Sequence, residues 1–177
     1  MQDDGIDFLT NYIKINNIKY ILELGTAVGY SSIKMALVNN NINVTTIERD
    51  EERYNEAILN ISKMNLQKQI HCIKADALEI DLTDKYDLIF IDAAKSQNIK
   101  FFEKYNKLLN KNGSIIVDNI YFHGVIYEND ENLSRNVRGI KRKILEFIDY
   151  INSQTNYENK IYSKGDGIMV IKVKNEN

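Results

Sequence analysis

Two apolar stretches in the second half of the chain end on side chains that can bind a cation. YDLIFIDAAKS ends its apolar run at Asp92, with Lys95 three residues later, and GSIIVDN ends at Asp118 and Asn119. If the two stretches are neighbouring parallel strands, their ends lie about 5 Å apart and three oxygen donors converge. Carboxylate and amide oxygens suit Mg²⁺ or another hard divalent cation. The pattern predicts a metal site on Asp92, Asp118 and Asn119, with helix capping and an ordinary turn as the alternatives.

A glycine-containing turn near the N-terminus predicts a second binding site. The stretch ILELGTAVGYSS is apolar up to Leu24, except for Glu23, and then contains Gly25 and Gly29 before a helical pattern. Glycine lets the backbone approach a ligand closely, and the helix that follows offers unpaired N–H groups. In open α/β sheets the first strand-to-helix turn is the usual place for a ligand. Tight packing without a ligand is the alternative.

Acidic residues after the next two strands indicate which ligand the turn binds. Glu48 ends the second strand 23 residues after Gly25, where a carboxylate can accept hydrogen bonds from ribose hydroxyls. Asp76, in ADAL after the third strand, could meet an adenine amino group. The G-x-x-x-G spacing differs from that of dinucleotide enzymes, and Glu23 would repel a pyrophosphate but suit a cationic sulfonium. These residues favour S-adenosylmethionine over NAD.

Methyl transfer would give the two predicted sites a common purpose. Transfer to oxygen requires an acceptor oxygen that is ionised, or nearly so, and in line with the methyl group. A divalent cation can bind two adjacent acceptor oxygens and lower the pKa of the hydroxyl. Lys95 is the expected base, because a nearby cation and partial desolvation both favour the neutral amine. A solvated lysine is the alternative.

Strand and helix patterns alternate along the chain and would bring these residues to one rim. Apolar strands at YILEL, VTTIE, IHCIKA, YDLIFID and SIIVDN are interspersed with amphipathic helices such as IKFFEKYNKLL. A long helix from about Ser134 to Asn152 precedes two closing strands, NKIYS and GIMVIKV. Strands that are apolar on both faces indicate a mostly parallel sheet with helices on either side. The predicted fold class is α/β, in a single domain over residues 1–177.

Composition limits the classes of protein to which the chain can belong. Its 177 residues are 44% hydrophobic and include 23 basic and 25 acidic side chains, which argues against a general nucleic-acid coat. No apolar run is long enough to span a bilayer, and MQDDGIDF lacks the pattern of a signal peptide, so we expect a cytoplasmic protein. The single Cys72 has no partner for a disulfide and is expected to be a buried strand residue.

The order of these motifs resembles a known family. ILELGTAVGYSS, TIERD, KADALE, FIDAAKS and VDNIYFHG are similar to the successive motifs of the metal-dependent, catechol-type class I O-methyltransferases. The resemblance implies a Rossmann-like, seven-stranded, mostly parallel sheet with a reversed final hairpin. It also implies Mg²⁺ or another divalent cation on Asp92, Asp118 and Asn119, with Lys95 and Asp92 as catalytic residues. The contacts implied for S-adenosylmethionine are with Glu23, Gly25, Tyr30, Ser31, Glu48, Asp76, Ala77 and Asp92.

Within this family the chain is most similar to the bacterial branch that includes the tRNA 5-hydroxyuridine methyltransferase, which makes 5-methoxyuridine at the wobble position. FIDAAK, DNIYFHG, RNVRGIKRKI and GDGIMVIK carry this resemblance, and branch members with small phenolic substrates share the first two. The resemblance implies the tRNA anticodon region as partner. A small catechol-like or phenolic metabolite is the alternative acceptor, and a non-catalytic RNA-binding relative is a more distant alternative.

The long helix has two unlike faces, which bear on the choice of acceptor. At about 100° per residue, its apolar and basic side chains separate into opposite stripes. The apolar stripe contains Val137, Ile140, Ile144, Ile148 and Ile151, and the basic one contains Arg135, Arg138 and Arg142, with Lys141 and Lys143 at its flanks. The arginines could contact RNA phosphates, and a solvated face opposite the core is the alternative.

Residues near the metal motif and the N-terminus complete the expectations. Tyr121 and Phe122 could wall the acceptor pocket, and His123 could touch the acceptor, although a loop histidine is more often structural or exposed. Members of the resembled family carry further N-terminal helices that help to cover the site and often contribute to a dimer interface. Because this chain begins almost at GIDFLTNYI, we expect a trimmed chain or a short form with a more open site, and a homodimer is one possible assembly.

Overall fold

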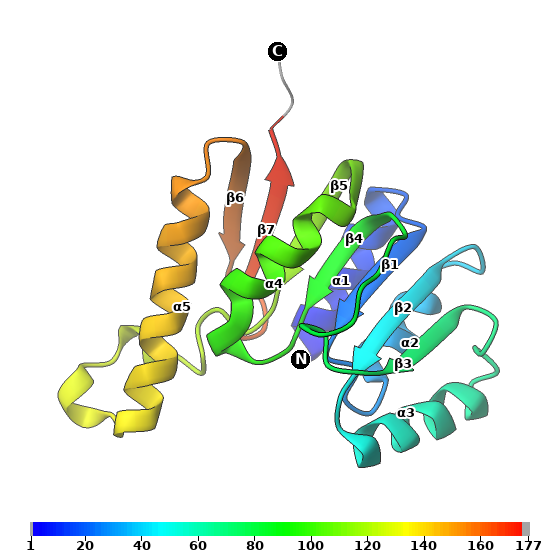
Figure 1. Ribbon diagram of the computed structural model, residues 1–177, viewed down its shortest axis with the longest axis horizontal. Coiled ribbons are helices and arrows are strands. Elements are labelled where there is room, and N and C mark those ends of the chain that lie inside the picture. The colour runs from blue at the N-terminus through cyan, green and yellow to red at the C-terminus, as the bar shows by residue number, and fades with distance from the viewer. Residues whose placement is uncertain (1, 175–177) are drawn as a thin grey trace.

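The computed structural model describes residues 2–174, which form a seven-stranded sheet with helices on both faces (Figure 1). The strands are β1 (Tyr20–Leu24), β2 (Asn43–Glu48), β3 (Ile70–Lys74), β4 (Tyr86–Ile91), β5 (Leu109–Val117), β6 (Tyr157–Tyr162) and β7 (Ile168–Val173). The α-helices are α1 (Asp3–Ile15), α2 (Tyr30–Ala36), α3 (Glu51–Lys63), α4 (Asn98–Tyr105) and α5 (Arg135–Ser153). Short 3-10 segments are η1 (Lys95–Gln97), η2 (Asn106–Leu108), η3 (Val125–Tyr127) and η4 (Asp130–Asn132).

The strand order creates a crevice between β1 and β4. The order across the sheet is β3-β2-β1-β4-β5-β7-β6. The first five strands pair in parallel, whereas β7 is antiparallel to both β5 and β6, which confirms the reversed final hairpin. The chain builds outward from β1 in one direction and from β4 in the other, so the crevice opens beyond the carboxyl ends of these two strands.

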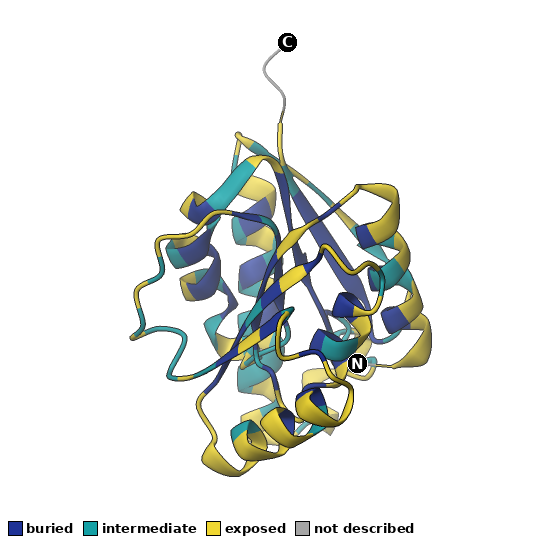
Figure 2. Cartoon of the chain, turned by 90° about the vertical axis from the view of Figure 1, so that its right-hand side faces the viewer, coloured by how far each residue is buried: buried dark blue, intermediate teal, exposed yellow. Residues whose placement is uncertain are grey.

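Each face of the sheet has its own hydrophobic core. Helices α1, α2 and α3 pack on one face, and α4 and α5 pack on the other. Alternation along β1 supplies both cores, because Ile21 joins the first cluster while Leu22 and Leu24 join the second. Figure 2 shows the result as buried strands between helices whose outer faces are exposed.

The predicted elements differ from the structure chiefly before β5. The helix expected over IKFFEKYNKLL is α-helical only to Tyr105, continues as η2 to Leu108, and is followed by β5 from Leu109. Leu109 pairs with Tyr86 across a register shift, so backbone pairing with β4 begins directly after the 3-10 turn. Cys72 is buried in β3, as expected. Within residues 2–174, no helix combines the length and apolar character of a membrane span.

Candidate active site

The ends of β4 and β5 bring together the side chains expected to bind a metal. Ile91 and Val117 are partners in the parallel ladder, so Asp92 and Asp118 leave neighbouring strands at the same level. The ladder continues past the strand ends, because Asp118 N donates to Ile91 O at 3.1 Å and Asp92 N donates to Leu24 O at 3.0 Å. Backbone pairing thus fixes the positions from which the Asp92 and Asp118 side chains extend.

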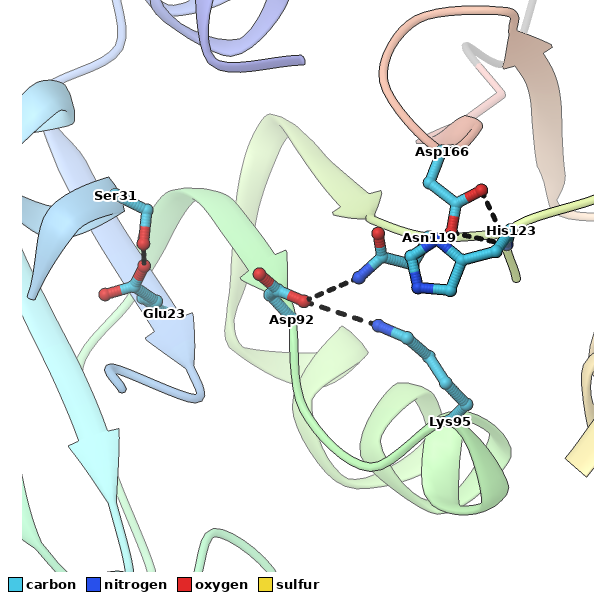
Figure 3. Close-up of polar contacts among 7 residues, drawn as sticks. All are labelled: Glu23, Ser31, Asp92, Lys95, Asn119, His123 and Asp166. Atoms are coloured by element: carbon cyan, nitrogen blue, oxygen red, sulfur yellow. Dashed lines mark hydrogen bonds and ion pairs between the residues drawn. The ribbon is translucent and has the colours of Figure 1, made fainter. Parts of the chain in front are cut away.

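Lys95 and Asn119 both point toward Asp92 (Figure 3). Asp92 Oδ1 accepts hydrogen bonds from Lys95 Nζ and from Asn119 Nδ2, each at 3.3 Å. The Lys95 side chain is 15% exposed, so little water separates this pair. Asn119 has a left-handed backbone, with φ of 58°, which asparagine tolerates better than most residues. A half-turn of its amide would direct Oδ1 toward the same point.

Asp118 is a buried carboxylate that lacks a hydrogen-bond partner. The residue is 1% exposed, and neither side-chain oxygen accepts a hydrogen bond from the residues that the structure describes. Burial and the charge of Asp92 together raise the pKa of Asp118 to about 6, although the nearby backbone amide of Asn119 and the charge of Lys95 act to lower it. Such a group costs free energy unless a cation or donor pairs with it.

The donor set therefore fits a divalent cation. It comprises the carboxylates of Asp92 and Asp118 and the amide of Asn119, which are hard oxygen donors of the kind that Mg²⁺ and Mn²⁺ prefer. A cluster of at least three His, Cys, Asp or Glu side chains around one metal position does not occur within residues 2–174. The unpaired oxygens of Asp118 support the site because positive charge there would offset the burial of that carboxylate.

A cavity of about 320 Å³ lies beside this cluster, at the carboxyl ends of β1 to β4. Five of the expected cofactor residues are in its wall, namely Gly25, Glu48, Asp76, Ala77 and Asp92. Sequence analysis did not identify several other lining residues, among them Ala27, Arg49, Arg53, Gln97 and Phe101. Arg49 could have been suspected because it directly follows Glu48. Phe101 gave no such signal, because the apolar periodicity of its helix identifies core residues and does not indicate which of them border a cavity.

The acidic side chains of the cavity are held by backbone groups. Glu48 is buried, and its two oxygens accept hydrogen bonds from Ala27 N at 2.8 Å and Asp50 N at 2.9 Å. Each carboxylate oxygen can accept more than one hydrogen bond, so Glu48 can still receive two ribose hydroxyls. Asp76 Oδ1 likewise accepts from Leu78 N at 2.8 Å. The turns that follow β1, β2 and β3 therefore hold both carboxylates in place before any ligand binds.

Gly25 is required by the protein itself as well as by the cavity. Its φ is 98°, in the left-handed region, and a Cβ at this position would overlap the backbone carbonyl oxygen of Asp92. The sequence suggested only close approach to a ligand. The structure adds that the end of β1 packs directly on the end of β4, which brings the cavity and the metal cluster together.

Glu23 lies beneath the glycine turn and is absent from the cavity wall. On β1 it faces α2, and its carboxylate accepts hydrogen bonds from the hydroxyls of Ser31, Ser32 and Thr46. Burial raises the pKa of Glu23 to about 7, although the three hydroxyls act to lower it. Ser31 and Tyr30 also lie outside the cavity wall. Direct contacts from Glu23, Tyr30 and Ser31 to a cofactor remain predictions, and the structure assigns Glu23 a fully bonded place under the turn.

The loop after Asn119 leads to an exposed histidine. The His123 side chain is 76% exposed, and its Nδ1 lies 3.4 Å from Asp166 Oδ2 (Figure 3). Tyr121 and Phe122 are partly buried against the core on the α4 and α5 side. Sequence analysis did not identify Asp166, although the two glycines that flank it marked a turn.

Comparisons with known proteins identify the chemistry of this crevice. The O-methyltransferase family model matches residues 1–174. The chain belongs to this O-methyltransferase family. It is 30% identical over 175 residues to the caffeoyl-CoA O-methyltransferase of Populus kitakamiensis, and the match covers 94% of this chain and 74% of that protein.

Solved structures of similar fold support the assignment to this family. A Staphylococcus aureus protein provisionally named as a caffeoyl-CoA O-methyltransferase superposes with a TM-score of 0.94 at 37% identity, over 98% of this chain and 85% of the other. An O-methyltransferase from Bacillus cereus in complex with SAH gives a TM-score of 0.84 at 28% identity, over 98% and 82% of the two chains. This O-methyltransferase is therefore an S-adenosylmethionine-dependent enzyme, as predicted.

Proposed function

We propose that this O-methyltransferase depends on a divalent cation held by Asp92, Asp118 and Asn119, and that its acceptor carries two adjacent oxygens. The observation that carries the proposal is the buried carboxylate of Asp118 beside Asp92, at the mouth of the cofactor cavity, which accepts no hydrogen bond from residues 2–174. When bound, the cation would supply positive charge that favours the ionised form of the acceptor hydroxyl.

The residues around the cluster have separate roles in this proposal. Asp92 connects the cofactor cavity with the metal cluster, since it lines the cavity and also accepts hydrogen bonds from Lys95 and Asn119. Lys95, in its neutral amine form, takes the proton from the acceptor hydroxyl, because its hydrogen bond to Asp92 Oδ1 holds the nitrogen beside the cluster. Glu48 and Asp76 orient the nucleoside of S-adenosylmethionine. Tyr121 and Phe122 exclude water from one side of the acceptor.

The acceptor that we propose is 5-hydroxyuridine at the wobble position of tRNA, in which the hydroxyl and a carbonyl oxygen are adjacent. The exposed arginines of α5 support an acceptor rich in phosphate. Arg135, Arg138 and Arg142 line an open groove together with Ser96, which follows Lys95 in η1. In Figure 1 the start of α5 lies on the side of the molecule toward which β2 and β4 point.

The arginines of this groove keep most of their binding capacity, in contrast to the neighbouring lysines. Lys141 Nζ donates to Asp130 Oδ1 at 2.8 Å, and Lys143 Nζ donates to Glu146 Oε2 at 2.7 Å. The longer contact of Arg142 Nε with Glu146 Oε1, at 3.5 Å, joins two exposed side chains and competes weakly with a phosphate. The basic stripe that can meet RNA is therefore made by the arginines, with the lysines held by carboxylates.

A small phenolic acceptor is the second candidate, and the comparisons favour it. The Populus kitakamiensis relative is named for caffeoyl-CoA, and a Vitis vinifera relative that is 27% identical over 177 residues is named as a flavonoid 3',5'-methyltransferase. A phenol with a neighbouring hydroxyl offers the same pair of oxygens to the cluster. The geometry of the cluster suits both acceptors.

Methyl incorporation from labelled S-adenosylmethionine tests the proposal. Undermodified tRNA and a panel of catechols and monophenols are offered in parallel, with and without a chelator. We expect incorporation into tRNA that stops with chelator and returns with Mg²⁺ or Mn²⁺. Incorporation into catechols alone would replace the tRNA acceptor with the phenolic one. Full activity in chelator would overturn the cation.

A further inference from the structure

The turn between β6 and β7 holds the loop that carries Asn119. Three backbone amides of this loop donate to two consecutive residues of the turn. Ile120 N donates to Gly167 O at 2.9 Å, and Tyr121 N donates to Asp166 O at 2.8 Å. His123 N donates to both oxygens of the Asp166 carboxylate, at 2.7 and 2.8 Å, across a sequence separation of 43 residues.

The loop held in this way has an unfavourable backbone. Asn119, Phe122 and His123 have φ values of 58°, 49° and 54°, and Gly124 has a φ of 81°. Left-handed conformations cost free energy for residues other than glycine, and they persist only where surrounding contacts enforce them. A charged acceptor is among the strongest partners for a backbone N–H, so the Asp166 carboxylate is well suited to enforce this bend.

The turn is itself fixed against the loop. Gly167 N donates to Lys164 O at 3.0 Å, which closes the turn, and a Cβ on Gly167 would lie 2.7 Å from the Tyr121 ring. Asp166 is only 7% exposed, so water competes little for its carboxylate. Figure 3 shows Asp166 directly above His123 and Asn119, on the side opposite Lys95.

We propose that Asp166 is a positioning residue that fixes Asn119 for cation binding through the His123 backbone amide. This inference rests on the metal site proposed above. A ligand at the start of a bent loop keeps its direction only if the bend is held, and the side chains that hold a metal ligand commonly set metal affinity. This contact does not require the imidazole of His123, because the carboxylate binds the backbone N–H, which any residue other than proline would present at this position.

Two substitutions separate the backbone contact from the imidazole. Asp166→Asn keeps the shape of the side chain but removes the charge and one of the two acceptor oxygens. His123→Ala removes the imidazole, 3.4 Å from Asp166, and keeps the backbone amide. Mn²⁺ affinity is measured by electron paramagnetic resonance, S-adenosylmethionine affinity by calorimetry, and folding by thermal melting.

We expect Asp166→Asn to weaken Mn²⁺ binding by about tenfold or more, with S-adenosylmethionine affinity within about twofold of the unsubstituted chain. We expect His123→Ala to change both affinities by less than about twofold, because the backbone N–H remains. An Asp166→Asn protein that binds Mn²⁺ as tightly as the unsubstituted chain would overturn the proposal. So would equal losses of Mn²⁺ affinity in both variants, which would assign the effect to the imidazole.

Hydrogen exchange of the loop amides separates failure of this inference from failure of the proposed function. If the unsubstituted chain binds no Mn²⁺, the cation of the proposed function is wrong, and the loop is then judged by exchange alone. Faster exchange at residues 119–124 in Asp166→Asn, with the strands unchanged, would support the positioning role. Unchanged exchange would overturn it.

Discussion

Two buried carboxylates at the same rim differ in how the protein treats them. Glu23, under the glycine turn, is bonded by three hydroxyls from α2 and β2. Asp118, at the end of β5, has no hydrogen-bond partner among the described residues. Burial raises the pKa of both, to about 7 and about 6. The difference teaches that the chain completes the Glu23 site by itself, whereas the bare carboxylate of Asp118 is the basis for the cation that we propose.

The same contrast extends across the rim. On the cofactor side, Glu48 and Asp76 receive backbone N–H groups from the turns around them. On the acceptor side, Asn119 begins a loop with several left-handed residues that a distant turn must hold. We interpret the cofactor side as preorganised by backbone hydrogen bonds within the chain, and we propose that the acceptor side is organised by the turn between β6 and β7 together with a cation.

The largest expected effect is the loss of methyl transfer in Asp118→Ala. This change removes a ligand of the proposed cation, so we expect turnover to fall by more than about a hundredfold. S-adenosylmethionine affinity should stay within about twofold, because Asp118 is outside the cavity wall. Turnover and calorimetry on the same preparation check both statements. Unchanged turnover would show that the Asp118 carboxylate serves no cation in the reaction.

The pH dependence of the free energy of unfolding tests the burial of Glu23, one side of this comparison. The unfolded carboxyl loses its proton near 4.5, whereas the folded one keeps it to about 7, so stability falls as pH rises between these values. The shift corresponds to about 3 kcal/mol. Glu23→Gln should remove the part of this dependence that extends to about pH 7 and leave the part below about pH 6 that comes from Asp118, whose pKa is also raised. Glu158→Gln, an exposed change on β6, should leave the whole dependence in place. Denaturant unfolding from pH 4.5 to 8 checks the slope; equal slopes in all three proteins would contradict the assignment.

Glu48→Gln should have the opposite selectivity to Asp118→Ala. A glutamine lacks the charge and one acceptor oxygen, so it can accept from only one of Ala27 N and Asp50 N and offers less to ribose hydroxyls. We expect S-adenosylmethionine affinity to fall by about tenfold to a hundredfold, with Mn²⁺ affinity unchanged. Calorimetry with each ligand measures this. If this variant lost affinity for S-adenosylmethionine and for Mn²⁺ to the same degree, the cofactor site and the cation site would not be independent.

The smallest expected effect concerns the arginine groove of α5. Arg138→Gln should raise the KM for tRNA a few-fold and reduce its salt dependence, with a slope smaller by about one. Turnover of a catechol should not change, because a small phenol does not reach the groove. Lys111→Gln, an exposed change at the opposite end of β5, is the control. Equal tRNA kinetics in both variants would remove the groove from the tRNA interface.

Much of the fold and the site was predictable from local pattern. Strands that are apolar on both faces indicated the parallel sheet, and residues at strand ends indicated the rim, since parallel strands deliver their carboxyl ends to one edge. The convergence of Asp92, Asp118 and Asn119 was therefore predictable from position alone, and their binding of a cation stays a prediction. The change from α-helix to a 3-10 turn after Tyr105 was missed, because the pairing of Leu109 with Tyr86, which ends this helical segment, joins distant parts of the chain.

The sequence by itself determined the family, the order of the strands' functional residues and the chemical types that line the rim, because these follow from short-range spacing. Only the tertiary structure decided which carboxylates are satisfied, since hydrogen-bond partners come from other elements. Glu23 is bonded by α2 and β2, Asp118 has no hydrogen-bond partner among residues 2–174, and Asp166 reaches His123 across 43 residues. Burial and partner geometry, which no local pattern encodes, separate the carboxylates that support the structure from the one for which we propose a cation.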